Sequence, residues 1–206
     1  MSQRVMIDIR PADVTRAFVR RSAGAKLAFA LEGLGRPASV RGGGWDRRAI
    51  PIQSHPTYRL MHALVELDFD PSLCLDALFI YFRDKGRSRR KAFAKARAQL
   101  HDYVSEYRGL YESMRDHGYL PRLADDEMGI AIDREGAIIK VPNGNHRFYT
   151  ALALEMPLVP AEVRFVHAAW YRRQTAELRG SVLERICEAL QRSGMNGCRI
   201  VEPREG

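Results

Sequence analysis

Five consecutive residues in the C-terminal half of the chain combine a glycine with four side chains that can bind an anion. They are Asn143, Gly144, Asn145, His146 and Arg147. The first amides of a helix have no intrahelical partner and lie at the positive end of the helix dipole. The glycine lets the backbone approach an oxyanion, and the guanidinium can hold two oxygens at once. The sequence therefore predicts a phosphate-binding or anion-binding turn at the start of a helix.

A purely structural explanation of these residues is also open. Asn143 could cap the helix, Gly144 could relieve a tight turn, and His146 and Arg147 could simply be exposed. A strand is predicted before the turn and a helix after it. Because this context brings helix amides toward a ligand, it favours the anion-binding interpretation.

The segments around the turn predict the order strand, strand, glycine turn, helix, strand. The first two strands form a hairpin around the turn Asp133–Gly136, and Pro142 breaks the second strand. The predicted ranges are Met128–Ile132 and Ala137–Val141 for the hairpin, about His146–Glu155 for the helix and Val159–Val166 for the last strand.

A long basic helix is predicted upstream, from Arg89 to about His117, with Ser88 as its N-cap and Gly118 ending it. Apolar or small residues recur three and four apart, at Phe93, Ala96, Leu100, Tyr103, Tyr107, Leu110 and Met114. This seam could form a coiled-coil homodimer, but Gly109 interrupts it, and packing against the chain's own core is favoured. The opposite face could contact nucleic acid or be solvated; it carries Arg89, Arg90, Lys91, Lys95 and Arg97.

The N-terminal region predicts a strand, several helices and a glycine-rich loop. The strand covers Val5–Ile9, and Asp13 can cap a helix running to about Leu31. Short strands are expected around Ala38–Val40 within the loop Gly33–Pro51. Two further helices are expected at Pro56–Leu67 and Pro71–Phe82, and beyond the glycine turn an amphipathic helix over about Thr175–Arg192 precedes a loose tail after Gly194.

Composition indicates a folded chain with a preference for anionic partners. The net charge is +8, from 33 Lys+Arg against 25 Asp+Glu, and arginine provides most of the excess. Such charge attracts nucleic acid, nucleotides or acidic and phosphorylated substrates, although GC-rich coding gives the same arginine bias. Three cysteines without a Cys-x-x-Cys motif indicate no disulfide framework. No signal peptide or membrane span is expected, so we predict a cytoplasmic protein.

Residues 110–166 resemble the core of the ParB/sulfiredoxin-like superfamily. The matching segments are LYESMRDHGYL and IAIDREGAIIKVPNGNHRFYTALALEMPLVPAEVRFV. The residues that carry the resemblance are Ser113, Met114 and Gly118, then Gly144, His146 and Arg147, then Val159, Pro160 and Val163. The resemblance implies an α+β fold, with a small mixed sheet and helices, in which the glycine turn binds nucleotide phosphates.

Two departures from the family narrow what the resemblance implies. Sulfiredoxins carry a catalytic cysteine at the position of Asn145, so we do not expect sulfinic-acid reduction. Partition proteins follow this core with a DNA-binding region and a dimerisation domain, whereas 40 residues follow Val166 here. A chromosome-partition role is therefore not expected.

Kinase members of the superfamily use an acidic residue near the phosphates as a general base. The acidic candidates here are Asp46, Glu112, Asp133 and Glu135. Trp45 and Asp46 follow three glycines, so Trp45 could stack on a base and Asp46 could bind Mg²⁺ or accept a proton. Trp45 could equally fill the edge of the core, and Glu112 could be a surface carboxylate.

Metal binding by the protein itself is not predicted. His62 and Glu66 are one helical turn apart and His55 is nearby, but no further ligand with recognisable spacing follows. These residues are expected in the core or on the surface.

Three functions remain open on the sequence. The first is a nucleotide-binding enzyme of phosphoryl-transfer type, a kinase or NTPase, which holds a nucleoside di- or triphosphate with Mg²⁺ at residues 143–147 and uses Asp46, Glu112 or His146 as catalytic residues. The second is a nucleic-acid-binding or nuclease-like module, and the third a non-catalytic nucleotide-sensing protein. The expected segments are 1–87, the nucleotide-binding core 88–167, and a C-terminal helix and tail at 168–206.

Overall fold

The fold is α+β, built around one mixed eight-stranded sheet. The computed structural model describes residues 3–19, 38–120 and 128–202. The strands are β1 (Arg4–Ile9), β2 (Arg16–Ala17), β3 (Ser39–Arg41), β4 (Ile50–Pro51), β5 (Gly129–Ile132), β6 (Ile138–Lys140), β7 (Val159–His167) and β8 (Arg199–Val201). The α-helices are α2 (Pro56–Glu66), α3 (Leu75–Asp84), α4 (Arg89–His117), α5 (Asn145–Ala153), α6 (Ala168–Thr175) and α7 (Val182–Arg192).

The sheet has the order β4-β2-β6-β5-β7-β1-β8, and β3 also pairs with β7. The pairs β5–β7, β2–β6 and β3–β7 are parallel, while β5–β6, β1–β7, β1–β8 and β2–β4 are antiparallel. Every residue of β5 is buried, and so are seven of the nine residues of β7. These central strands are nearly continuous apolar runs because both of their faces are covered.

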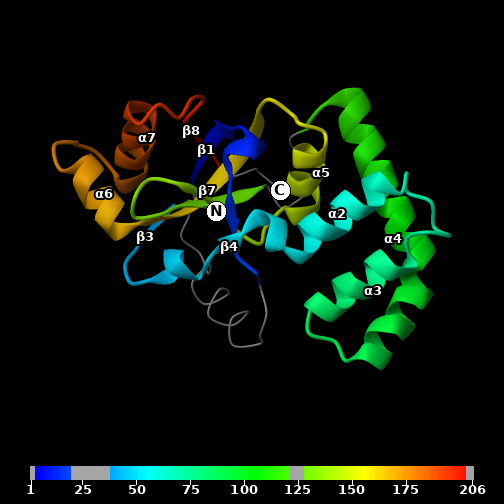
Figure 1. Ribbon diagram of the computed structural model, residues 1–206. Helices are drawn as coiled ribbons and strands as arrows, with labels where there is room; N and C mark the ends of the chain where they lie inside the picture. Colours follow the sequence, from blue (N-terminus) through cyan, green and yellow to red (C-terminus); the bar gives the residue numbers. More distant parts are fainter. Residues whose placement is uncertain (1–2, 20–37, 121–127, 203–206) are drawn as a thin grey trace.

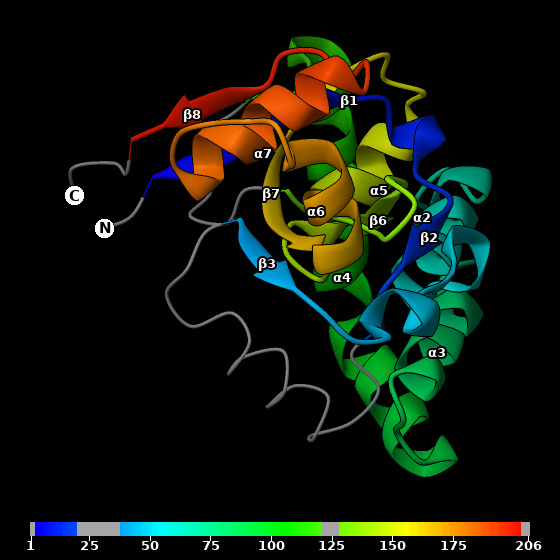
Figure 2. The same ribbon diagram turned by 90° about the vertical axis from the view of Figure 1, so that its left-hand side faces the viewer.

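Helices flank the sheet at opposite ends of the molecule. Figure 1 shows α6 and α7 on one side of the strands and the helical group α2, α3 and α4 on the other, with α5 between the sheet and this group. Turning the view brings α6 and α7 to the front (Figure 2). Strands from the N-terminal, central and C-terminal segments all join the same sheet, so one hydrophobic core connects them.

The structure confirms the elements around the glycine turn. The hairpin β5–β6, helix α5 and strand β7 follow in the predicted order, and α4 covers Arg89–His117 with Ser88 accepting a hydrogen bond as its N-cap. Gly118 ends α4 with a φ of +73°. Ala96, Tyr107 and Met114 of the seam are buried within the chain, whereas Phe93 is 45% exposed. A homodimer through α4 stays a prediction.

The helix predicted from Asp13 is wrong for the part that the structure describes. Pro11–Asp13 forms a 3-10 turn, and Arg16–Ala17 forms β2 instead. Strand β2 pairs with β4 on one side and with β6 on the other, and the Phe18 amide donates to the Lys140 carbonyl at 2.9 Å. Sheet pairing therefore outweighs the local helical pattern. Residues 20–31 of the predicted helix lie outside the described ranges.

Three other boundaries differ from the predictions. Helix α3 begins at Leu75 rather than Pro71, because the Asp70 carboxylate accepts from the Ser72 amide at 2.8 Å and closes a turn there. The C-terminal helix predicted over about Thr175–Arg192 begins only at Val182, since Gly180 has a φ of +103° and Ser181 opens α7 with a capping box, and helix α6 before it was not predicted. As far as residue 202, the last that the structure describes, the tail is not loose, because residues 199–201 form β8 and pair with β1.

No helix in the described ranges is both long and apolar enough to cross a bilayer.

Candidate functional site

Gly144 forms the bend from which helix α5 starts. Its φ of +65° and ψ of +33° lie in the left-handed region, which glycine adopts without a steric penalty. Its carbonyl accepts the first intrahelical hydrogen bond, from the Phe148 amide at 3.0 Å. Helix geometry leaves the amides of Asn145, His146 and Arg147 without intrahelical partners. The turn thus has the backbone geometry of an anion site.

Two buried residues next to the turn, Lys140 and Gly129, fix its position. Lys140 is 1% exposed, and its Nζ donates to the carbonyls of Val141 and Asn143. A Cβ added to Gly129 would lie 2.6 Å from a methyl group of Val141 and 3.3 Å from Cβ of Asn143. The β5–β6 hairpin therefore fixes the position of the turn and places a positive charge within hydrogen-bonding distance of its backbone.

A cavity of about 420 Å³ opens in front of the turn. Gly144, Asn145, His146 and Arg147 line it from α5, and His55, Pro56 and Thr57 line it from the start of α2. The positive ends of two helix dipoles therefore meet at one cavity. Phe18, Val19 and Pro142 add an apolar wall. Volumes from about 300 to 1,000 Å³ are usual for small-molecule sites.

Lys85, at the end of α3, brings a further cation to this cavity. Its Nζ donates to the Tyr81 hydroxyl at 2.5 Å and lies 4.3 Å from the centre of that ring. Partial burial of the ammonium, and to a smaller degree the charge of Arg87, lower the pKa of Lys85. A less hydrated ammonium interacts more strongly with an incoming anion.

His55 connects the cavity with the interior of the protein. Its Nδ1 accepts a hydrogen bond from the Thr57 amide at 3.2 Å, which caps α2 and assigns the ring proton to Nε2. The ring stacks on Tyr149 of α5 with 4.8 Å between centroids and an interplanar angle of 27°. The imidazole is 4% exposed, so its orientation is set by packing on both sides.

His146 and Glu106 form a pair at the edge of the turn. The His146 Nδ1 lies 3.7 Å from a carboxylate oxygen of Glu106 on α4, and the imidazole packs against Tyr107 with 4.8 Å between ring centroids. Burial lowers the pKa of His146, and the neighbouring carboxylate partly opposes this effect. A neutral imidazole oriented by a carboxylate is suited to accept a proton.

Arg147 and Asn145 contribute from the first turn of α5. The Arg147 guanidinium lies 5.4 Å from the centre of the Tyr119 ring, which positions it beside the cavity. The Oδ1 of Asn145 is buried and has no hydrogen-bond partner among the described residues. Since the oxygen and nitrogen of an amide can be exchanged by rotation, this buried position can equally present an NH₂ donor.

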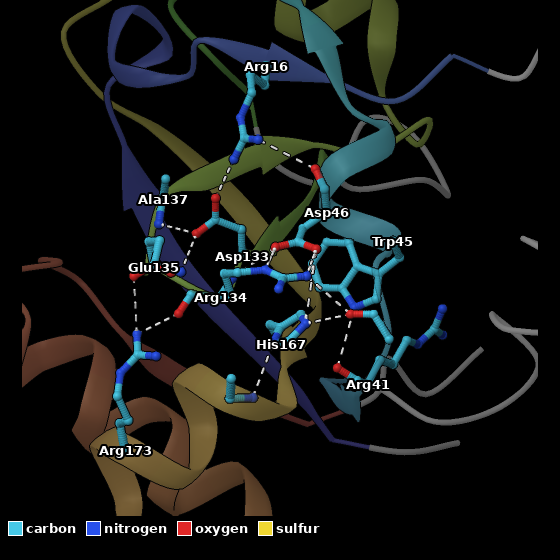
Figure 3. A network of polar contacts seen from close by, with 12 residues as sticks. Arg16, Arg41, Trp45, Asp46, Asp133, Arg134, Glu135, Ala137, His167 and Arg173 are labelled. Carbon is cyan, nitrogen blue, oxygen red and sulfur yellow. Dashed lines mark hydrogen bonds and ion pairs between the residues drawn. The ribbon is translucent and has the colours of Figure 1, made fainter.

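Asp46 lies in a different polar network, shown in Figure 3. Its carboxylate accepts from Arg134 Nε at 2.6 Å and from Arg134 Nη2 at 2.7 Å, and His167 Nε2 is 4.0 Å away. The hydrogen bond from Arg134 lowers the pKa of Asp46 to about 2. This network joins the glycine loop 42–44 to the hairpin turn, because Arg134 and His167 also donate to the Gly43 carbonyl. Asp46 does not line the cavity at residues 144–147.

The other acidic candidates are also placed away from the described cavity lining. The Asp133 carboxylate pairs with Arg16 and accepts from the amides of Glu135 and Ala137 at 2.9 and 2.8 Å, so it closes the hairpin turn (Figure 3). Glu135 is exposed and faces Arg173 at 3.7 Å. Glu112 is exposed on α4.

Trp45 packs in a small aromatic cluster rather than at the turn. Its ring centre is 4.8 Å from that of Phe165 and 5.9 Å from that of Phe18, and its Nε1 donates to the Arg41 carbonyl at 3.3 Å. Trp45 therefore packs against the central strands β5 and β7, and Phe18 is the ring that reaches the cavity.

The residues considered for a metal do not converge. His62 Nδ1 pairs with Glu66 at 3.2 Å on the exposed face of α2, whereas His55 is buried at the helix start. Within the described ranges, no three His, Cys, Asp or Glu side chains are grouped as metal ligands.

Lys85, Lys140, His55 and Glu106 are the site residues that sequence reasoning missed. Each is at least 38 positions from Gly144 or, for Lys140, buried in a strand, so no local motif identifies them. The lysine within the apolar run Ile138–Val141 was an available signal, because a buried ammonium needs acceptors around it. Comparison of the chain with family models, with curated proteins and with solved structures finds no match in any of the three.

Proposed function

We propose that the protein is a nucleotide-binding enzyme of phosphoryl-transfer type, with residues Asn143–Arg147 around the phosphates. The observation that carries this proposal is the 420 Å³ cavity, at which the starts of α2 and α5 meet together with Lys85, His146 and Arg147. Helix amides, an ammonium and a guanidinium are the groups that bind polyphosphates in proteins.

The cavity has a cationic side and an apolar side, which suit the phosphates and the base of a nucleotide. The cationic side takes the phosphates, and Phe18, Val19 and the two prolines Pro56 and Pro142 offer an apolar wall to a base. The described lining residues include no carboxylate, so a Mg²⁺ ion accompanying the nucleotide would take its oxygen ligands from phosphates and water.

His146, paired with Glu106, is the residue we assign to proton transfer. It lines the cavity, and the carboxylate 3.7 Å from its Nδ1 stabilises the imidazolium that forms when the ring accepts a proton. In phosphoryl transfer most of the catalysis comes from positioning and charge stabilisation, which the helix starts, Lys85 and Arg147 would supply.

Membership of the ParB/sulfiredoxin-like superfamily is part of this proposal. The succession of hairpin, glycine turn, helix α5 and strand β7 supports it. Asn145 stands where sulfiredoxins have their cysteine, so we propose nucleotide chemistry and not sulfinic-acid reduction.

Thermal denaturation with and without ATP, ADP or CTP, each at millimolar concentration with Mg²⁺, tests the proposal. We expect at least one nucleotide to stabilise the folded protein by RT ln(1+[L]/Kd) and so to raise the melting temperature, and we expect the variants Arg147→Ala and Lys85→Ala to abolish the increase. Lys91→Ala removes the same charge from the exposed start of α4 and serves as the matched control. The proposal fails if no nucleotide stabilises the protein, or if Lys91→Ala removes the effect equally.

Two other functions make different predictions from the same protein. A nucleic-acid-binding or nuclease-like module is favoured by the exposed cations at the start of α4, Arg89, Arg90 and Lys91, and requires DNA or RNA binding that weakens steeply with salt and is lost in Lys91→Ala. If the protein is a non-catalytic nucleotide sensor, ATP should raise the melting temperature in the same way but no phosphate should be released from it. Native protein and His146→Gln should then give the same background rate of phosphate release.

A further inference from the structure

A second and larger cavity lies beside the phosphate cavity, on the same pair of helices. Its volume is about 690 Å³. It is lined by the middle of α2, the later part of α5, and the segments 10–15, 52–53 and 155–157. Helices α2 and α5 lie side by side (Figure 1), so that their first turns border one cavity and their later turns the other.

The lining of this second cavity is mainly apolar and aromatic. Met61 and Val65 of α2 face Leu152 and Met156 from the α5 side. The four charged residues that line it are exposed or paired at its edge, as in the ion pair His62–Glu66, whose side chains are 55% and 65% exposed. A molecule bound there would bury an apolar body between two helices and leave its charged neighbours at the rim.

Tyr149 lines this cavity and has a buried hydroxyl. The residue is 1% exposed, and its hydroxyl has no hydrogen-bond partner among the described residues. Burial raises the pKa of Tyr149 far above its ordinary value, so the phenol keeps its proton and remains a donor. A buried hydroxyl without a partner costs free energy that a ligand with an acceptor would recover.

Tyr149 also joins the two cavities physically. Its ring stacks on His55, which lines the phosphate cavity, and its edge contacts Tyr58, with 6.2 Å between centroids and an interplanar angle of 76°. Both tyrosines line the second cavity. The two binding spaces are therefore separated by one stacked pair of rings.

We propose that this second cavity is a binding site for a small amphipathic molecule with an apolar, ring-sized body and one hydrogen-bond acceptor. The body packs between α2 and α5, and the acceptor accepts a hydrogen bond from the Tyr149 hydroxyl. The site is distinct from the phosphate cavity and does not depend on nucleotide binding.

A pair of probes that differ only in the acceptor tests this assignment. Acetophenone carries a carbonyl, and ethylbenzene has nearly the same shape without one. In saturation-transfer NMR titrations we expect acetophenone to bind about three- to tenfold more tightly than ethylbenzene, the usual net effect of one hydrogen bond. Tyr149→Phe should remove that preference while ethylbenzene still binds, and Arg147→Ala should leave both affinities unchanged.

Two further variants control for the fold and for the location. Tyr171→Phe deletes another buried hydroxyl without a described partner outside the cavity and should keep the preference. Ala153→Phe fills the cavity and should abolish binding of both probes, and Ala153→Met should weaken both if the phenylalanine variant does not fold. Equal affinities for the two probes in the native protein, or a preference that persists in Tyr149→Phe, would overturn the proposal, as would the absence of saturable binding.

Discussion

At each of two glycine-containing turns the structure places an arginine and a histidine, but these residues are used differently. At the loop of Gly42–Gly44, Asp46 accepts two hydrogen bonds from Arg134 and lies 4.0 Å from His167. At the turn around Gly144, the corresponding side chains His146 and Arg147 border a cavity and pack on tyrosines. The first turn contains its own counter-anion, whereas the second combines cations and helix amides without a carboxylate in the described cavity lining.

This difference separates a structural role from the binding role that we propose for residues 143–147. A buried carboxylate that is already matched by a guanidinium stabilises the fold and has no capacity left for a substrate. A cluster of donors that borders a cavity can instead be stabilised by an anion that binds there. Similar residue types can therefore serve different functions, and the two hydrogen bonds from Arg134 to Asp46 mark the structural one.

Replacement of the arginine in each region gives the largest expected contrast. Arg134→Met leaves Asp46 buried without its partner, so we expect the melting temperature to fall by roughly 10 °C. Arg147→Met should lower it by only a few degrees, because this guanidinium packs on Tyr119, but should abolish the nucleotide-dependent shift. Differential scanning fluorimetry with and without ATP and Mg²⁺ measures both.

Arg115→Met is the control for the first variant, because it removes an exposed pair with Asp116 and should change the melting temperature by no more than about 2 °C. If Arg134→Met lowers the melting temperature no more than Arg115→Met does, the polar network around Asp46 does not stabilise the fold. The contrast between the two turns would then be wrong.

Acid denaturation should report the Asp46 pair. Its pKa is about 2 in the folded protein against an ordinary value of 3.8, so the stabilisation is complete above about pH 4 and is lost as pH falls toward 2. A shift of nearly two units corresponds to about 2 kcal/mol for this buried carboxylate. We expect urea denaturation at pH 6 to show Asp46→Asn less stable by about this amount and the difference to shrink below pH 3. A difference that does not change with pH would exclude the ion pair as its cause.

Gly144→Ala should destabilise the fold less than Arg134→Met or Asp46→Asn. The left-handed conformation costs a non-glycine residue about 1–2 kcal/mol, and relief of that strain would rotate the first amides of α5. We expect Gly144→Ala to be destabilised by about 1 kcal/mol in urea denaturation and to lose nucleotide binding.

Gly109→Ala is the matched control, since this glycine lies within α4 with open space at its Cβ position, and alanine there should stabilise the protein by up to about 1 kcal/mol. Nucleotide binding that survives in Gly144→Ala would show that the turn does not need its glycine conformation.

Local sequence signals predicted the parts of the fold that depend on neighbouring residues. Helix α4 begins after Ser88 and ends at Gly118, as expected. The pattern of strand, turn and strand around Asp133–Gly136 forms the β5–β6 hairpin. Capping residues and turn residues act within a few positions, so their effect can be read from the chain. The helix predicted from Asp13 failed for the described residues because β2 takes its hydrogen bonds from β4 and β6, which are far away in sequence.

The sequence by itself determined that residues 143–147 form a glycine turn at the start of a helix, because glycine, asparagine and the flanking periodicities are local properties. Only the tertiary structure decided what surrounds that turn. It brings the start of α2 and Lys85 to the cavity, holds Lys140 beneath it, and pairs Asp46 with Arg134 elsewhere. The reason is physical: an anion site is set by the sum of charges within a few ångströms, and those charges come from segments that the chain sequence separates by many residues.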